Sequence, residues 1–369
     1  MERNRHARTH EQAFRFLRLD GVERSAFEWW VQLDRKNSIK RDRVWRDPFL
    51  RTLCDLAVHR SSPLHVHTSG TTGPPKPLRI PRRDLVNSAR LTADTFDLNP
   101  GDRALLCLPC EYIAGKMMLV RAMALGLDLH VIDPRGALLN NLKVHDRFRF
   151  TAMVPLQLHR AVQDDRARVE RQFDQVLLGG GPVSQALIED VSGISTRVFL
   201  GYGSTETVTH VAIRPLNGPD RQDHFAALGA VTFHTDRRGC LVVRTPHLTV
   251  KEHVTNDLVE LLDERNFLWK GRADHVILSG GKKIHPEQLE SRTAGLIPFP
   301  HYFTATPDDR LGQAVVLVLE TELSADDVLP EILDQLRDTL SPHELPRRVM
   351  AMRHLPRTSS GKVKRPKEV

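Results

Sequence analysis

The sequence predicts an α/β protein with a large layered α/β N-terminal domain, which includes a β-rich subdomain, and a small α+β C-terminal domain. The chain has 369 residues, more than the roughly 250 to 300 at which single cores stop growing. From Leu64 to about Val211, short apolar runs alternate with amphipathic stretches. That alternation is typical of layered domains with largely parallel strands.

Residues 1–60 are rich in Trp, Phe and Arg and are expected to form helices packed on the body. Each later strand is expected where a short apolar run occurs, and each helix where an amphipathic stretch follows. The expected strands are 64–67, 104–109, 129–132, 150–155, 175–180 and 196–203. The expected helices are 82–96, 114–126, 137–146, 155–163 and 183–191.

The pattern changes after Ala226. Up to about Phe267, short strands separated by turns predict the β-rich subdomain. The segment 271–274 then leads into the small domain. Its expected elements are strand 275–278, helix 286–294, strands 301–306 and 314–319, helix 325–339 and strand 348–352. The sequence therefore predicts two domains, 1–272 and 273–369.

Composition narrows the class of protein. Hydrophobic residues make up 40% of the chain and charged residues 27%, as in ordinary folded, soluble proteins. The net charge of +7 is scattered, and no aromatic and basic motif supports a nucleic-acid binder. No apolar run approaches the ~18 to 20 residues that span a bilayer. The N-terminus lacks the apolar segment of a secretory signal, so the cytoplasm is the expected location.

Cys107 and Cys110 form a C-L-P-C sequence at the end of an apolar run. No second close pair completes a zinc site, and no helix start follows that would lower a thiol pKa. We therefore expect both to be buried structural residues rather than metal or redox groups.

The strongest local signal is the segment from His67 to Lys76, H-T-S-G-T-T-G-P-P-K, directly after a strand-like run. Its two glycines permit close backbone approach, its hydroxyls and amides donate hydrogen bonds, and Lys76 adds a positive charge. These features suit a polyphosphate, although the spacing differs from a Walker A loop. Taken alone, the segment is as compatible with a plain turn.

Two carboxylates strengthen the interpretation as a nucleotide site. In G-Y-G-S-T-E at 201–206, Glu206 lies beside two hydroxyls and is a candidate Mg²⁺ ligand at a phosphate. In T-N-D-L-V-E-L, Asp257 is a candidate acceptor for both ribose hydroxyls. Two further segments, 271–290 and 356–365, follow in the small domain.

These five segments, in this order, resemble the adenylate-forming superfamily of acyl-CoA and aryl-CoA ligases, peptide-synthetase adenylation domains and luciferases. The resemblance runs from about residue 64 to the C-terminus and implies that fold, with a mobile lid as the small domain. Within the superfamily, 104–122 and 201–214 are most similar to the short-form o-succinylbenzoate-CoA ligases of menaquinone biosynthesis. Pro77 departs from the glycine that many members have after the loop lysine.

The resemblance also implies roles for individual residues. The implied catalytic groups are Lys76, Lys362 and Glu206, with Glu206 as the Mg²⁺ ligand. The implied ATP contacts are Ser69, Gly70, Thr71, Thr72, Gly73, Lys76, Gly179, Gly180, Gly181, Pro182, Gly201, Tyr202, Gly203, Thr205, Asp257 and Arg272. The implied hinge is Asp274, and the implied CoA-tunnel loop contains Gly280, Gly281, Lys282 and Lys283.

The chemistry of such enzymes needs cations where two anions meet. A carboxylate attacks the α-phosphorus of ATP, so positive charge is required from Mg²⁺, Lys76 and Lys362. Pyrophosphate leaves, and CoA thiolate then attacks the acyl carbonyl and expels AMP. The resemblance implies that the small domain rotates between the two steps, replacing Lys362 with the 280–283 loop.

The expected acyl-substrate contacts are Tyr112, Gly115, Lys116 and His210. Lys116 is a cation that a fatty acid would not need, so we expect it to meet the distal carboxylate of o-succinylbenzoate. An exposed helix lysine is the competing interpretation, and His210 and Arg214 are further candidates for the carboxylate. The alternative functions are another aryl or acyl acid ligase, or a degenerate nucleotide-binding homologue. The predicted partners are therefore a small acid, ATP and CoA, and neither nucleic acid nor membrane.

Overall fold

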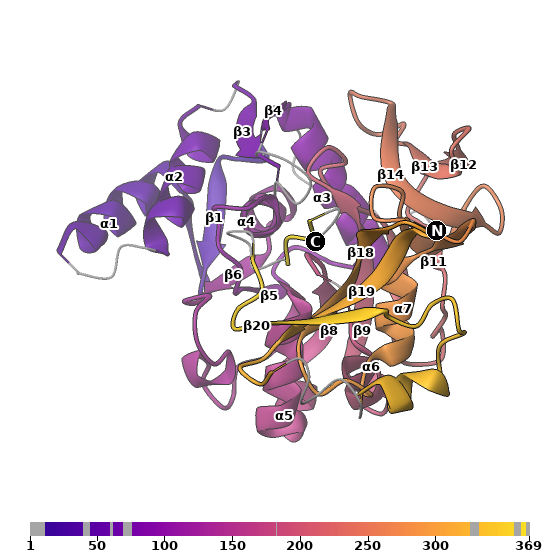
Figure 1. Ribbon diagram of the computed structural model, residues 1–369. Helices are drawn as coiled ribbons and strands as arrows, with labels where there is room; N and C mark the ends of the chain where they lie inside the picture. The colour runs from indigo at the N-terminus through magenta and orange to yellow at the C-terminus, as the bar shows by residue number, and fades with distance from the viewer. Residues whose placement is uncertain are drawn as a thin grey trace.

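The computed structural model describes residues 12–39, 45–59, 62–68, 76–181, 183–324, 332–357 and 363–366. Most strands belong to one sheet of 13 strands, in the order β12-β13-β14-β15-β11-β10-β9-β8-β7-β5-β6-β1-β2, and a second sheet of five strands follows it along the chain. Figure 1 shows α1 and α2 at one end of the molecule, β12 to β14 at the other, and the second sheet in front.

The centre of the large sheet is parallel, as the alternation predicts. The pairs β1–β6, β6–β5, β5–β7, β7–β8 and β8–β9 are all parallel. The strands are β1 (Phe16–Leu19), β2 (Val22–Ser25), β5 (Arg103–Leu106), β6 (Asp128–Val131), β7 (Phe148–Met153), β8 (Phe173–Leu178) and β9 (Arg197–Ser204). Because side chains alternate along a strand, the consecutive buried residues of β5, β7 and β8 lie on both faces of the sheet.

Helices cover both faces of this sheet. On one face, buried residues of α1, α2, α3 and α4 form one core cluster with Ala104 and Leu106, and on the other, buried residues of α5 and α6 form one with Leu105 and Cys107. The helices are α1 (Ala26–Ile39), α2 (Arg46–Ala57), α3 (Arg82–Phe96), α4 (Ile113–Leu125), α5 (Pro155–Gln172) and α6 (Gln185–Ser192). The two cores make the three-layer arrangement of an α/β domain.

The other half of the large sheet is antiparallel and matches the expected β-rich subdomain. Its strands are β10 (Thr209–Pro215), β11 (Phe225–Ala227), β12 (Thr232–Thr235), β13 (Cys240–Arg244), β14 (Glu252–Leu261) and β15 (Asn266–Arg272). Phe225, Phe233 and Phe267 form its aromatic core with Tyr202, whose ring meets that of Phe267 edge-on at 5.0 Å. Such packing fixes the position of the Tyr202 hydroxyl.

The small sheet begins five residues after β15 ends. Its elements are β16 (Ile277–Ser279), β17 (Lys282–Ile284), α7 (Pro286–Thr293), β18 (His301–Asp308), β19 (Gly312–Glu320) and β20 (Arg348–Met352). Residues 332–337 are helical, within the expected helix 325–339, whose first part lies outside the described residues. The proposed domain boundary at 272/273 falls in the connection between the two sheets.

Three expectations about secondary structure were wrong. The N-terminal region contains a hairpin, β1–β2, because Asp20 and Gly21 both adopt positive φ (48° and 82°), a turn that joins antiparallel strands. The expected helix 137–146 is only a 3₁₀ turn at Leu139–Asn141, since asparagines favour turns over helix interiors. The strand β3 (Leu64–His67) is not in the large sheet and pairs only with β4 (Pro77–Ile80).

Within the described ranges, no helix has the length and apolar character needed to cross a bilayer. Cys107 and Cys110 are buried, as expected. Burial raises the pKa of both thiols to about 12, so they stay protonated at neutral pH.

Candidate active site

The bend between β9 and β10 brings the 201–210 segment back across the carboxyl end of the parallel strands. Ligands bind at this edge in open α/β sheets. A Cβ atom at Gly203 would lie 1.9 Å from the carbonyl oxygen of Thr209, so only glycine fits there. Val208 and Thr209 have φ of 53° and 86°, a strained backbone for β-branched residues. The tight bend is therefore held by its surroundings.

Hydrogen bonds inside the bend hold its shape. The hydroxyl of Thr207 accepts from the Ser204 amide at 2.8 Å and donates to the Thr209 carbonyl at 2.8 Å. The Ser88 hydroxyl of α3 donates to the Val208 carbonyl at 2.7 Å. As a result Thr205 is buried while Glu206 between the two threonines is exposed. The carboxylate of Glu206 is free to face a ligand in solution.

Asp257 of β14 lies at the centre of a polar cluster. Its Oδ2 accepts from the Tyr202 hydroxyl at 2.6 Å, and its Oδ1 accepts from Trp269 Nε1 at 3.2 Å. Arg272 Nη1 lies 3.8 Å from Oδ1 and extends the cluster to Asp274, to which it donates at 2.9 and 3.0 Å. Burial, followed by the charge of Asp257, raises the pKa of Tyr202, so this phenol donates rather than ionises. The structure thus brings together three predicted nucleotide contacts.

The base of the predicted phosphate loop is described, whereas its tip is not. The Lys76 amide donates to Thr68 Oγ1, and the Thr68 amide donates to the Lys76 carbonyl, both at 3.0 Å. Lys76 is exposed, and Pro77 after it is the first residue of β4, a position where proline is tolerated. Outside the described residues lie Ser69, Gly70, Thr71, Thr72, Gly73, Pro182 and Lys362.

The glycines 179–181 lie at the same edge, directly after β8. Gly180 has a φ of 82°, a conformation that side-chain-bearing residues rarely adopt. A Cβ at Gly179 would meet no atom within 4 Å, so the backbone there borders open space. A Cβ at Gly201 would instead lie 3.2 Å from His210 Cβ. Backbone is therefore accessible at 179, and His210 packs beneath 201.

The expected acyl residues divide between two sides of α4. Gly115 fits tightly under the preceding turn, since a Cβ there would lie 2.3 Å from the Pro109 carbonyl oxygen. The Lys116 ammonium donates to Thr52 Oγ1 of α2 at 3.2 Å, and burial lowers its pKa. The ring of His210 instead packs on Phe96 of α3, with 6.0 Å between ring centroids. Tyr112 immediately precedes α4.

One buried cation near this region was missed by sequence reasoning. Arg121 of α4 is 1% exposed and lies 3.5 Å from His210 Nδ1. The signal that could have revealed it is a single arginine within the otherwise apolar run M-M-L-V-R-A-M-A-L.

The predicted CoA loop is a tight hairpin between β16 and β17. Gly280 and Gly281 have φ of 55° and 77°, the positive values that a two-residue turn of this kind requires. Lys282 after them lies 3.3 Å from His343 Nδ1 and lines a cavity with Arg347. The two cationic side chains would suit the phosphates of CoA.

A buried ion-pair cluster joins the predicted hinge to the C-terminal segment. Glu287 of α7 meets His275 Nδ1 at 2.5 Å and Arg365 Nη1 at 3.6 Å. Arg365 Nη2 also donates to Glu290 at 2.5 Å, and Glu290 accepts from the Phe303 amide at 3.0 Å. Burial, and repulsion from Glu287, raise the pKa of Glu290 to about 7. Arg365 thus anchors residues 363–366 to α7.

We expect Glu290→Gln to change how stability depends on pH. Because the pKa of Glu290 is raised in the folded protein to about 7 from its ordinary value of 4.5, the favourable contribution is complete below pH 4.5 and is lost as pH rises through 7. Relative to the variant, wild type should lose about 3 kcal/mol of unfolding free energy across that window. Thermal unfolding of both proteins from pH 4.5 to 8 measures this, and parallel curves would contradict it.

Comparisons with known proteins identify the family and the fold. The family described as AMP-binding enzyme matches residues 56–238. A probable 2-succinylbenzoate–CoA ligase of Mycobacterium tuberculosis is 30% identical over 341 residues, which cover 82% of each chain. Among solved structures, an acyl-CoA synthetase (AMP-forming)/AMP-acid ligase II-like protein from Dyadobacter fermentans is 35% identical, with a TM-score of 0.58, and covers 88% of this chain and 93% of that one.

A more distant structure shares the fold. The O-succinylbenzoate coenzyme A synthetase of Bacillus subtilis, solved with ATP and a magnesium ion, is 22% identical with a TM-score of 0.68. The match covers 82% of this chain and 68% of that one. Both solved structures therefore agree with the predicted superfamily fold.

Proposed function

This chain belongs to the family of AMP-binding enzymes and is an AMP-forming acid–CoA ligase, and from that premise we propose that its acid is o-succinylbenzoate. The observation that carries the proposal of an adenylating site is the bend 203–209, which exposes Glu206 at the sheet edge where β9 also presents Tyr202 to Asp257. The similarity to a probable 2-succinylbenzoate–CoA ligase supports the choice of acid.

The polar residues around Tyr202 would hold the nucleoside. The Asp257 carboxylate is 17% exposed and already accepts two hydrogen bonds, so its orientation is fixed before a ribose arrives. Its remaining lone pairs suit the two ribose hydroxyls. The open backbone at Gly179 and Gly180 would lie beside the adenine. In a preorganised site of this kind, little binding free energy is lost to the ordering of side chains.

The residues present fit a magnesium ion that is carried mainly by ATP. In the described part of the chain, no cluster of three or more His, Cys, Asp or Glu side chains could hold a metal alone. Glu206 instead offers a single exposed carboxylate, and Mg²⁺ commonly takes one or two carboxylates together with substrate phosphates and waters. The ion would neutralise charge on the phosphates.

The protein's own cations would act on the reacting groups. Lys76, exposed at the base of the phosphate loop, would neutralise the outer phosphates as pyrophosphate leaves. Lys362 would bridge the acid's carboxylate and the α-phosphate. For the second step, the loop at Gly280, Gly281 and Lys282 would replace Lys362 after the lid at 273–369 turns about Asp274, so that CoA thiolate reaches the acyl carbonyl.

Pyrophosphate release from a panel of acids, with and without CoA, tests the proposed function. We expect release with o-succinylbenzoate, and AMP together with the acyl-CoA only when CoA is added. A fatty or plain aryl acid is the second candidate for the substrate. Release with benzoate or fatty acids but not with o-succinylbenzoate would reject the proposed acid in favour of that candidate.

A further inference from the structure

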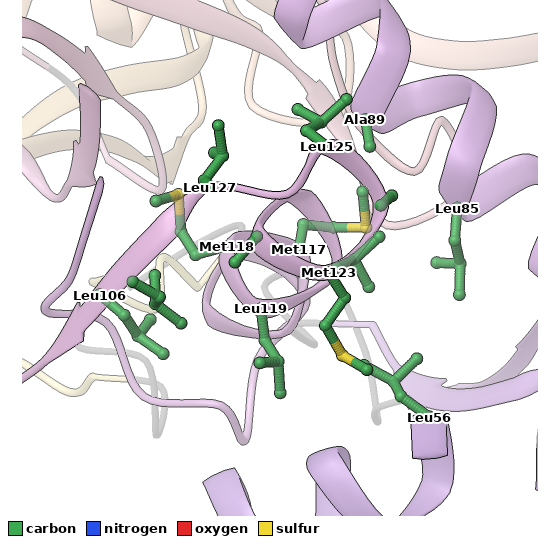
Figure 2. Close-up of a cluster of buried hydrophobic side chains, with 14 of the residues drawn as sticks. Leu56, Leu85, Ala89, Leu106, Met117, Met118, Leu119, Met123, Leu125 and Leu127 are labelled. Carbon is green, nitrogen blue, oxygen red and sulfur yellow. The ribbon is translucent and has the colours of Figure 1, made fainter. Parts of the chain in front are cut away.

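Arg121 is a charged residue in the middle of an apolar helix. Around α4, Figure 2 shows aliphatic side chains from three other elements, including Leu56 of α2, Leu85 of α3 and Leu106 of β5. Arg121 is 1% exposed and is the largest fully buried side chain in the described residues. Burial of a cation costs several kcal/mol unless an anion compensates it.

The described partners of Arg121 are all uncharged. Its Nε donates to Thr92 Oγ1 and its Nη2 to Thr209 Oγ1, both at 3.1 Å, while Nη1 lies 3.5 Å from Met118 Sδ. Burial lowers the pKa of Arg121 to about 9, and no carboxylate of the described residues opposes that shift. The guanidinium is thus still positive at neutral pH and has no counter-anion among the described residues.

His210 adds an unsatisfied donor beside this cation. Its Nδ1 lies 3.5 Å from Arg121 Nη2 and 3.4 Å from Thr209 Oγ1. Burial, together with the charge of Arg121, lowers the pKa of His210 well below its usual value, so the ring is neutral. Since Nδ1 faces donors and acts as the acceptor, the proton belongs on Nε2. Nε2 is buried and has no hydrogen-bond partner in the described structure.

The cluster adjoins the candidate active site. Thr209 and His210 end the bend that exposes Glu206, and His210 Cβ lies beneath Gly201. Three elements, α3, α4 and β10, meet here. An uncompensated cation and an unpartnered N–H donor, both against the 201–210 segment, make a receptor for one anionic group.

We propose that Arg121 and His210 Nε2 bind the second carboxylate of the acid substrate and thereby determine specificity for a dicarboxylic acid. The inference rests on the proposed function, which supplies an acid with two carboxylates, and it assigns that carboxylate to the β10 side of α4 rather than to Lys116 on the α2 side. A site built around a charged group rejects an analogue that lacks the group, because its own polar atoms are then left unpaired.

The test compares o-succinylbenzoate with 4-oxo-4-phenylbutanoate, which lacks the ring carboxylate. In Arg121→Met we expect the KM for o-succinylbenzoate to rise by ~30-fold and the KM for the monocarboxylate to stay within about twofold. Because the substitution removes an uncompensated buried charge, the thermal midpoint without acid should be unchanged or higher. A merely structural arginine would instead give a lower midpoint and equal effects on both acids.

Three further variants keep the test decisive. Arg121→Lys should retain part of the discrimination, and His210→Gln should weaken it by ~10-fold, so either can carry the test if Arg121→Met does not fold. Arg168→Met is the matched control, because Arg168 donates to the Leu139 and Leu142 carbonyls on the opposite face of the sheet. Its preference between the two acids should equal that of wild type.

The outcomes separate this inference from the proposed function. A selective rise in the KM for o-succinylbenzoate in Lys116→Met, with none in Arg121→Met or His210→Gln, would place the carboxylate at α2 and overturn the inference alone. Wild type could instead fail to ligate o-succinylbenzoate but ligate another dicarboxylic acid. If Arg121→Met then abolished the preference for the second carboxylate of that acid, the inference would be supported and the proposed acid rejected. Equal changes for charged and uncharged acids would overturn the inference.

Discussion

Glu206→Gln is expected to slow acyl-adenylate formation by ~100-fold to 1,000-fold while leaving the fold intact. The side chain is exposed, so no buried interaction is lost. The bend around it is held by Thr207, Ser204 and Gly203 through contacts in which the Glu206 carboxylate takes no part. Under the proposed function, the amide removes one negative charge beside the phosphates, and with it the carboxylate expected to bind the metal.

Pyrophosphate release measured across a range of Mg²⁺ concentrations reports on this change. The variant should need more Mg²⁺ for half-maximal rate, and its maximal rate should stay low. Glu189→Gln is a matched control, since Glu189 is likewise exposed but belongs to α6. Activity within about threefold of wild type at every Mg²⁺ concentration would show that Glu206 is not at the phosphates.

The sequence predicts the buried elements well because burial itself is periodic. The expected helix 82–96 and strand 348–352 agree with α3 and β20 at both ends, and α3 buries one regular face. The sequence does not predict an element's place in the fold when that place depends on which strand it pairs with rather than on burial. The run L-H-V-H looks like a core strand, yet β3 alternates buried and exposed residues and pairs only with β4. No periodicity specifies which strand a short run will pair with.

The candidate site shows the same division. The residue types at Glu206 and Asp257 indicate nucleotide chemistry from the sequence, but the hydrogen bond from Tyr202 to Asp257 joins positions 55 residues apart. The direction of Lys116 was not predictable, because each residue along a helix turns the side chain by ~100°. The burial of Arg121 was not predicted, because a single charged residue in an apolar helix is usually interpreted as one whose charged end reaches solvent. Only the packing of α3, α4 and β10 shows that it is enclosed.

Asp257→Asn is expected to raise the KM for ATP by ~30-fold to 100-fold, and Tyr202→Phe by no more than about fivefold. Tyr202→Phe loses the hydroxyl that donates to Oδ2 at 2.6 Å, whereas Asp257→Asn replaces one carboxylate oxygen with an amide N–H group. The amide N–H of Asp257→Asn faces Trp269 Nε1 or the Tyr202 hydroxyl, both of which donate hydrogen bonds to the wild-type carboxylate. The neutral amide also no longer attracts Arg272, which lies 3.8 Å from Oδ1. A ribose would therefore face a neutral and wrongly oriented group in Asp257→Asn, but an intact carboxylate in Tyr202→Phe.

The ranking of the two variants is the decisive measurement, because it separates the carboxylate from the tyrosine that orients it. Hydrogen bonds to charged groups contribute about 1.5 to 3 kcal/mol each, so loss of the charge should dominate over loss of a single donor. Steady-state KM values for ATP at saturating acid and CoA provide the comparison, and the thermal midpoint without ligands checks the fold. If Tyr202→Phe were the more severe variant, the phenol rather than Asp257 would be the group that holds the nucleotide.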